Sequence, residues 1–423
     1  MKEPWHNRVL VVGTTADYID WIRKAVPERA LFITAPSIRK TAAEDRPKEH
    51  EEILVPLTDP AGIRTALDTH LARYKIRLTG ITCFDCEHMG LTADLAERLK
   101  LTYPGRKAVD TARDKFVSKR LWQEAGLRCP SVSMVNTAED ARCFMAGLPH
   151  GMVLKPVAGS GSELVFKCRT PGQADAAFDV IRDELKKRLA NPLFHSGQPD
   201  LMLAEEMIPG PEYSCDFIMG KTSVQVIRIT RKIKPRHLPF GTTTGYALVT
   251  DQNSHLDKKR LEETLFKAAR TLGIHSGICM VDFILTDRQA PVLIEMTPRP
   301  GGDCLPYLLR QAGGLDILSL ALDVAQGKVP ALNGNLRFTP MVAVKILAEK
   351  AGTLKNIDTR EVAGDPRIRE IFLSKKPGHV VVMPPQDYDS RVLGHIITLP
   401  DTPNYLDAQC GLMRLRVKTE MDQ

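Results

Sequence analysis

Short apolar runs alternate with amphipathic stretches through the N-terminal quarter of the chain. The apolar runs are rich in aliphatic side chains and predict β-strands at residues 8–13, 30–34, 52–55 and 80–83. Between them, apolar residues recur at helical spacing, for example at 60–74 and 91–100. Strands that alternate with helices favour a parallel sheet with helices on both faces. The pattern therefore predicts an α/β domain that ends near Gly105.

Two later apolar runs each contain a carboxylate. The runs, 277–285 and 291–297, flank a short polar turn, a pattern that predicts a β-hairpin with Asp282 opposite Glu295. Because side chains alternate along a strand, Thr297 lies on the same face as Glu295. A buried carboxylate is costly unless it is paired or bound to a metal. The hairpin predicts either a magnesium–polyphosphate site or two acids met by lysines or solvent.

A lysine-bearing strand precedes a loop of small residues. Lys155 lies in the apolar run 152–156, and Gly159-Ser160-Gly161-Ser162 follows it closely. Such a loop can bring backbone N–H groups close to a polyphosphate, while the lysine supplies a point charge. The G-x-x-x-x-G-K-[ST] pattern is absent, so this is not a Walker A loop. Taken alone, the segment is also compatible with a simple turn.

Acidic residues flank a Pro-Gly-Pro break after the next predicted strand. Glu205, Glu206 and Ile208 lie in the run 201–208, and Glu212 follows the break. The carboxylates and exposed backbone of such a segment can hydrogen-bond a base and a ribose. The alternative is a β-turn with solvated acids.

Basic residues concentrate in two predicted elements. One is a single amphipathic helix over 107–126, which carries Lys115. Taken alone, Lys115 is most simply interpreted as a surface lysine. The other is a hairpin over 214–234, whose second strand carries Arg228, Arg231, Lys232 and Lys234. These four side chains are anion ligands if they face a phosphate site, and a solvated edge otherwise.

Composition narrows the class of protein. A length of 423 residues suggests two to three domains, and 43% hydrophobic and 26% charged residues are ordinary for a soluble globular protein. The net charge of +7 comes from scattered basic residues, so nucleic-acid binding is not implied. Nine scattered cysteines suit a reducing cytosol, and no apolar run reaches the ~18 residues of a membrane span. We therefore expect a cytoplasmic protein without membrane contact.

The order of these features resembles the ATP-grasp superfamily of carboxylate ligases. A helix lysine, a strand lysine with a Gly/Ser loop, an acidic hinge, an Asp and the run Glu-x-Thr-Pro-Arg-Pro-Gly-Gly (295–302) follow one another across roughly residues 8–330. The chain is most similar to members that look like L-amino-acid ligases and carbamoyl-phosphate-synthase-like proteins.

The resemblance implies a mixed α/β and α+β fold in three parts. These are a Rossmann-like pre-ATP-grasp domain over 1–106, a two-lobed ATP-grasp domain over 107–330 and a small C-terminal α+β lobe over 331–423. The ATP-grasp domain would divide into a lid-bearing lobe at 107–200 and a catalytic lobe at 201–330. In the C-terminal lobe, we expect strands at 341–346, 380–383 and 414–417.

The resemblance also implies a nucleotide and metal site. Residues that would hold the ATP phosphates, or close over them, are Lys115, Lys155, Gly159, Ser160, Gly161, Ser162 and, in a looser alignment, Lys232. Residues that would contact adenine or ribose are Glu205, Glu206, Ile208 and Glu212. Residues that would bind Mg2+, or Mn2+ in its place, are Asp282, Glu295 and Thr297. The family usually has Asn at the third of these positions and frequently Glu at the first, which puts the second metal site in doubt.

By the same resemblance, the carboxylate substrate would lie against Arg299, Gly301 and Gly302, with Arg299 and Lys155 as catalytic groups. The implied reaction activates a small-molecule carboxylate as an acyl-phosphate, releases ADP and phosphate, and joins the acid to an amine. Two alternatives stay open. One is a carboxylase or carbamoyl-phosphate-type enzyme that uses bicarbonate, and the other is a catalytically impaired ATP-binding regulatory protein. Dimerisation is an expectation from the resemblance alone.

Overall fold

The N-terminal part of the chain folds as its alternating pattern predicts. The computed structural model describes residues 5–159, 161–188, 200–235, 238–250, 256–286, 290–330, 332, 337–401 and 406–422. Its first elements are β1 (His6–Val12), α1 (Ala16–Ala25), β2 (Ala30–Thr34), α2 (Ile38–Thr41), β3 (Glu52–Leu54), α3 (Pro60–Arg73), β4 (Ile76–Thr82) and α4 (Met89–Leu99). The strands form a parallel sheet in the order β3-β2-β1-β4.

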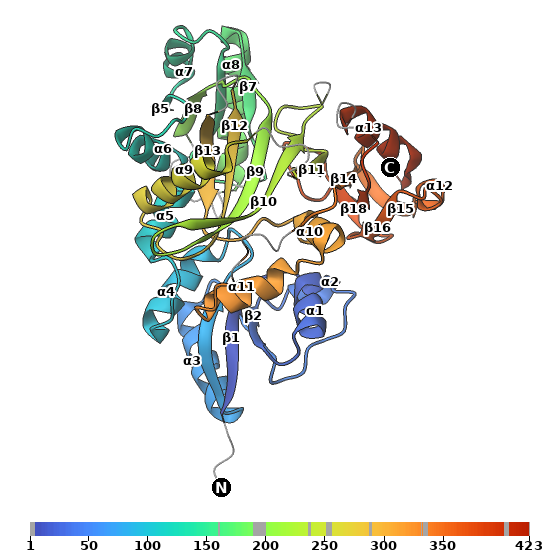
Figure 1. The fold of residues 1–423 in the computed structure, drawn as a ribbon. Helices are drawn as coiled ribbons and strands as arrows, with labels where there is room; N and C mark the ends of the chain where they lie inside the picture. Colours follow the sequence, from blue (N-terminus) through green and yellow to red (C-terminus); the bar gives the residue numbers. More distant parts are fainter. Residues whose placement is uncertain are drawn as a thin grey trace.

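Strand β1 contributes side chains to cores on both faces of this sheet. Val9 and Val11 pack in one cluster with α1 and with the distant helix α11 (Ile317–Ala325), whereas Leu10 and Val12 pack in another with α3 and α4. A strand that is covered on both faces is apolar along its whole length, which explains the continuous run in the sequence. Figure 1 shows α11 lying between this sheet and the larger sheet above it.

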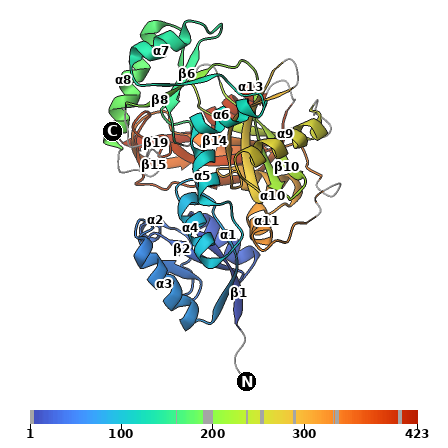
Figure 2. The ribbon, with the colours of Figure 1, turned by 90° about the vertical axis from the view of Figure 1, so that its left-hand side faces the viewer.

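A second, antiparallel sheet forms a small lobe. Its elements and the two helices before it are α5 (Arg106–Arg113), α6 (Lys115–Glu124), β5 (Val132–Val135), α7 (Ala138–Met145), β6 (Met152–Pro156), β7 (Phe166–Cys168), α8 (Pro171–Lys187) and β8 (Met202–Glu206). The strand order is β5-β8-β6-β7, and apolar residues of α7 and α8 cover one face. Figure 2 shows this lobe at the end of the molecule opposite the N-terminus.

The prediction of one helix over 107–126 is wrong. Asp114 has an extended backbone conformation and separates α5 from α6. Its carboxylate accepts hydrogen bonds from the backbone N–H groups of Phe116 and Val117, both at 2.9 Å. An aspartate that caps the next helix in this way favours a break over continuation. The break places Lys115 at the first position of α6.

The largest sheet has eight strands and carries the predicted carboxylates. Its first elements are β9 (Glu212–Met219), β10 (Val224–Ile233), β11 (Gly245–Leu248), α9 (Lys258–Thr271), β12 (Gly277–Leu285) and β13 (Pro291–Thr297), followed by α10 (Leu305–Gly313) and α11. The hairpins expected at 214–234 and 277–297 are both present. One face is apolar and packs beneath α9, so the opposite face is where polar residues of β9, β10 and β12 gather.

The C-terminal segment completes this sheet. Its elements are β14 (Val342–Leu347), β15 (Gly352–Asp358), α12 (Arg360–Ala363), β16 (Ile368–Leu373), β17 (Val380–Val381), β18 (Val392–Thr398), α13 (Leu406–Arg416) and β19 (Lys418–Asp422). The eight-stranded order is β13-β12-β9-β10-β11-β14-β18-β16, and β17-β15-β19 form a separate small sheet. Since β14, β18 and β16 extend the central sheet, a domain boundary at residue 331 stays a prediction.

The strand predicted at 414–417 is wrong. Residues up to Arg416 belong to α13, because Leu406, Cys410 and Met413 recur at helical spacing and pack into one core. The strand of this region is β19, which pairs with β15. Among the helices of the described residues, none combines the length and apolar character needed to cross a bilayer.

Candidate active site

The two carboxylates of the hairpin face each other across neighbouring strands. In the register of β12 and β13, Asp282 lies opposite Glu295, and Met280 lies opposite Thr297. Residues of β12 on either side of Asp282 pack into the core beneath α9, so its carboxylate points to the other face of the sheet. The structure therefore brings the three predicted metal ligands to one face.

Two buried oxygen atoms on this face lack a hydrogen-bond partner within the part of the chain that the structure describes. They are Oδ1 of Asp282 and Oγ1 of Thr297. Burial raises the pKa of Asp282 to about 6, although the nearby ammonium group of Lys232 opposes the rise. A buried oxygen left without a partner costs about 1–3 kcal/mol, so these two atoms are suited to a ligand.

The donor set fits Mg2+ that is shared with a phosphate. Mg2+ is usually held by one or two carboxylates, several waters and substrate phosphate oxygens rather than by a cage of protein ligands. The described residues contain no cluster of three or more His, Cys, Asp or Glu side chains that could hold a metal by itself. Asp282 and Glu295 would supply the two carboxylates, and the Thr297 hydroxyl adds a neutral oxygen.

Lys232 connects the hairpin acids to the predicted ribose ligand. Its ammonium group lies 2.7 Å from Glu212 and also pairs with Asp282. Lys234 pairs with the other oxygen of Glu212. Although burial raises the pKa of the Glu212 carboxyl, these two ammonium groups lower it to about 2. Glu212 therefore carries its charge at neutral pH and is an acceptor for hydroxyl groups.

Two lysines hold Glu205 in the interior. The Glu205 carboxylate lies 2.7 Å from Nζ of Lys155 and 2.9 Å from Nζ of Lys119. All three residues are buried. Although burial raises the pKa of Glu205, the two lysines lower it below its ordinary value. The side chain predicted to contact adenine is thus engaged by cations, and its role toward the base stays a prediction.

Lys119 was not among the predicted site residues. It lies four residues after Lys115 on α6 and donates a 2.6 Å hydrogen bond to the carbonyl of Ile294. Ile294 sits where the register of β12 and β13 shifts, so a β-bulge leaves it without a partner residue on β12. Lysines at positions i and i+4 lie on one helix face, and this spacing is the signal that sequence reasoning missed.

The loop of small residues closes on Lys115. Nζ of Lys115 donates a 2.8 Å hydrogen bond to the carbonyl of Gly159. Gly161 has a positive φ of 66°, and Ser162 one of 61°. A Cβ atom on Gly241, in the segment between β10 and β11, would lie 3.0 Å from that of Ser162. Ser160 lies outside the described residues.

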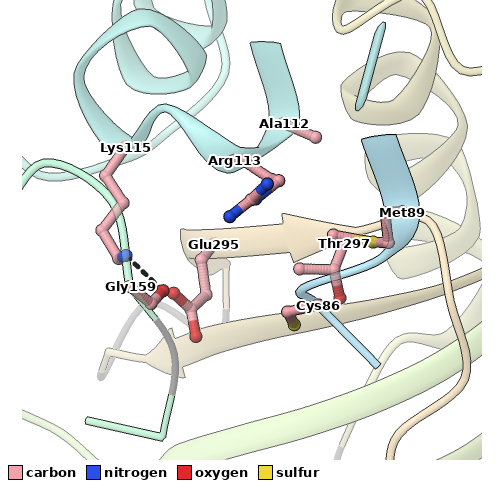
Figure 3. A pocket seen from close by; sticks show the side chains of 8 residues that line it. All are labelled: Cys86, Met89, Ala112, Arg113, Lys115, Gly159, Glu295 and Thr297. Carbon is pink, nitrogen blue, oxygen red and sulfur yellow. Dashed lines mark hydrogen bonds between the residues drawn. The ribbon is translucent and has the colours of Figure 1, made fainter. Parts of the chain in front are cut away.

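A small pocket joins these parts. It is lined by Cys86, Met89, Ala112, Arg113, Lys115, Gly159, Glu295 and Thr297. Figure 3 shows Lys115 and Arg113 approaching Glu295 from the break between α5 and α6, with Cys86 and Met89 of the N-terminal domain on the far side. The pocket therefore has two cationic side chains facing one carboxylate, and Arg113 is a second residue that the sequence interpretation missed.

Glu206 and Ile208 lie at the other end of the site. Glu206 ends β8, and its carboxylate accepts a 2.9 Å hydrogen bond from the hydroxyl of Ser131. Ile208 follows in the connection to β9 and is partly buried. This connection joins the small lobe to the central sheet, which is where the hinge was predicted.

The interpretation of Arg228 as an anion ligand or a solvated edge is wrong. Arg228 is 2% exposed and forms a two-point ion pair with Asp216, at 2.8 and 2.9 Å. Its other donors are used by Ser214 and Thr230. Asp216 also accepts a 3.0 Å hydrogen bond from the backbone N–H of Gly301. The pair therefore holds the Pro-Arg-Pro-Gly-Gly turn against the sheet.

Arg299 lies within this turn. Its Nε atom donates to Sγ of Cys86 at 3.1 Å, and its Nη1 atom donates to the carbonyl of Pro300 at 2.7 Å. A Cβ atom placed on Gly302 would lie 3.9 Å from Nη1 of Arg299. Gly302 therefore lies beside the guanidinium group, and its role toward a substrate stays a prediction.

Comparison with known proteins identifies the class. Residues 148–307 match the family model of the ATP-grasp domain. The chain is 29% identical over 244 residues to a D-alanine–D-alanine ligase of Aromatoleum aromaticum (56% of this chain, 74% of that protein). It is 24% identical over 228 residues to the dapdiamide A synthase of Enterobacter agglomerans (53% of this chain, 51% of that protein). The L-amino acid ligase from Bacillus licheniformis superposes with a TM-score of 0.75, at 19% identity and 100% coverage of both chains.

The fold is that of the ATP-grasp enzymes, and the expected mixed α/β architecture is confirmed. Residues 148–307 form an ATP-grasp domain, and this match together with the relatives supports an ATP-binding carboxylate ligase, as the order of motifs indicates.

The charge of Lys115 predicts a pH dependence of nucleotide binding. Burial lowers the pKa of Lys115 to about 8, although Glu295 opposes the shift. The ammonium group is lost as pH rises through this value, so we expect the affinity for MgATP to fall about tenfold between pH 7.5 and 9.5. Isothermal titration calorimetry measures this change. Lys115→Arg should bind with little pH dependence over this range, and an equal fall in both proteins would contradict the assignment.

Proposed function

We propose that this protein joins a small-molecule carboxylate to an amine, using ATP and Mg2+ and releasing ADP and phosphate. The observation that carries the proposal is the pair of opposed carboxylates, Asp282 and Glu295, beside a cluster of buried lysines. Two acids on one face supply a metal site, and the cations around them suit a polyphosphate. The D-alanine–D-alanine ligase and the dapdiamide A synthase support an amide-forming reaction.

The lysines and acids at one end of the site are placed to act on the phosphates. Lys115, Lys155 and Lys119 lie close enough to Glu295 for their charges to lower the pKa of its carboxyl, although burial opposes this. The lysines neutralise the negative charge that shifts onto phosphate oxygens during transfer. When bound, Mg2+ would be held by Asp282 and Glu295 and would add to this neutralisation.

The other end of the site receives the acid. Arg299 is partly buried, and its Nη2 atom makes no hydrogen bond to any described residue. A guanidinium group is suited to a carboxylate and to the oxyanion that forms when an amine attacks an acyl-phosphate. The Gly159–Ser162 loop, next to Gly241, is placed to exclude water, which would otherwise hydrolyse that intermediate.

A substrate screen tests the proposal. The protein with MgATP is incubated with amino acids and other small carboxylates, singly and in pairs, and ADP and phosphate are measured. We expect release that depends on an acid and rises with a particular amine, with the amide identified by mass spectrometry. Release with bicarbonate and no amine would instead indicate the carboxylase-type alternative. Binding of ATP without release for any acid would support a regulatory role.

A further inference from the structure

Cys86 is one of the residues through which the N-terminal domain contacts the site. It lies between β4 and α4, is 8% exposed and lines the pocket that contains Lys115 and Glu295. Its sulfur accepts the hydrogen bond from Nε of Arg299, a residue 213 positions away in sequence. Figure 3 shows Cys86 beside Thr297 on the floor of the pocket. Because the two residues are so far apart in sequence, no local pattern predicts this contact.

The contact leaves one side of the guanidinium group for a substrate. Nε is held by Cys86 and Nη1 by the carbonyl of Pro300. An arginine has five N–H donors in a fixed plane, so two anchored nitrogens set both the position and the tilt of that plane. Nη2, which makes no hydrogen bond to any described residue, is then the nitrogen left to bind an acid. Without the Cys86 sulfur, the Arg299 side chain would keep only its hydrogen bond to the carbonyl of Pro300 among the contacts of the described residues.

The loop that presents Cys86 is itself held firmly. The Asp85 carboxylate accepts from the backbone N–H of His88 at 2.9 Å and contacts the imidazole Nδ1 at the same distance. Gly13, at the end of β1 with a φ of 64°, lies so close that a Cβ atom there would collide with the His88 ring. A fixed loop can transmit the position of the N-terminal domain to Arg299.

We infer that Cys86 is a positioning residue, which orients the Arg299 guanidinium group toward the carboxylate substrate. The inference rests on the proposed function, because it takes the acid to lie beside Arg299. The competing explanation is packing alone, since Cys86 also belongs to an apolar cluster with Cys83, Met89, Ala93 and Val109. Substitution of Cys86 by serine distinguishes the two explanations, because the serine hydroxyl keeps an acceptor for Nε of Arg299 but fits an apolar cluster poorly.

Kinetics of matched variants test the inference. We expect Cys86→Ala to raise the KM for the carboxylate about tenfold, the cost of one hydrogen bond to a charged group, with the KM for ATP unchanged. Cys86→Ser should recover most of that loss, and Cys83→Ala should behave as wild type, because the Cys83 sulfur contacts Asp85 and not Arg299. A Cys86→Ala enzyme with an unchanged carboxylate KM, or a serine variant worse than alanine, would overturn the inference.

A second readout does not depend on turnover. The 15N-labelled Nε–H signal of Arg299, assigned by its loss in Arg299→Lys, should shift or broaden in Cys86→Ala and stay in place in Cys83→Ala. If the wild-type protein releases no ADP with any acid, the proposed function fails while this signal still reports on the contact. A signal unchanged in Cys86→Ala would show that the sulfur does not hold Arg299.

Discussion

Glu295→Gln is expected to reduce acid-dependent ADP release by at least about a thousandfold, equivalent to ~4 kcal/mol in the transition state. Glutamine keeps the size of the side chain but removes the charge that faces Asp282 and the lysines. Mg2+ prefers charged oxygen ligands, and one carboxylate would remain for it. The measurement is a coupled ADP assay at saturating ATP, with each acid found in the substrate screen.

A matched control keeps this test specific. Glu263 lies exposed on α9, away from the site, so Glu263→Gln makes the same chemical change on the surface and should leave the rate unchanged. Thermal unfolding of both variants establishes that they are folded. Turnover in Glu295→Gln close to that of the wild type would contradict the metal assignment, whatever the substrate proves to be.

Arg228→Met is expected to lower the free energy of unfolding by about 3–5 kcal/mol. The substitution removes the cation and leaves Asp216 charged in the interior, where an unpaired carboxylate is costly. Urea denaturation followed by circular dichroism measures the loss. The change should also loosen the Gly301 turn, because Asp216 accepts the backbone N–H of that residue.

The double variant Arg228→Met/Asp216→Leu separates an unpaired charge from poor packing. Replacing both partners by apolar residues is often nearly neutral, so we expect the double variant to recover much of the stability lost in the single one. A surface comparison is Arg106→Met, which breaks half-exposed ion pairs with Asp94 and Asp110 and should cost under ~1 kcal/mol. Equal losses in Arg228→Met and Arg106→Met would contradict the structural role given to the buried pair.

Features set by neighbouring residues could be predicted from the sequence. The parallel sheet, the hairpin and the opposed positions of Asp282 and Glu295 follow from periodicity, and the structure confirms them. The break at Asp114 was not predicted, because the amphipathic pattern is continuous there. The Asp114 side chain caps the following helix and ends the preceding one despite that pattern. The end of helix α13 was likewise predicted wrongly, because the alternation Arg-Leu-Arg-Val at 414–417 is typical of a strand.

Features set by distant residues could not be predicted. Arg228 looks like a surface cation in its own strand, and only the pairing of β9 with β10 places Asp216 beside it. Lys119 can likewise be recognised as a site residue only from its contacts with Glu205 and with the carbonyl of Ile294, and both partners are far along the chain. The order of the motifs identified the superfamily, but these contacts depend on the tertiary fold.

The eight-stranded sheet has a mechanical consequence. From β13 to the outer strand β16, every neighbouring pair of strands is joined by backbone hydrogen bonds, so we expect the sheet to behave as one stiff plate that resists shear. The four-stranded small lobe is a separate sheet, connected to the plate through the segments around α6 and Pro209. When the site opens to admit a nucleotide or release a product, we therefore expect the small lobe to rotate as a rigid body while the eight-stranded sheet stays fixed.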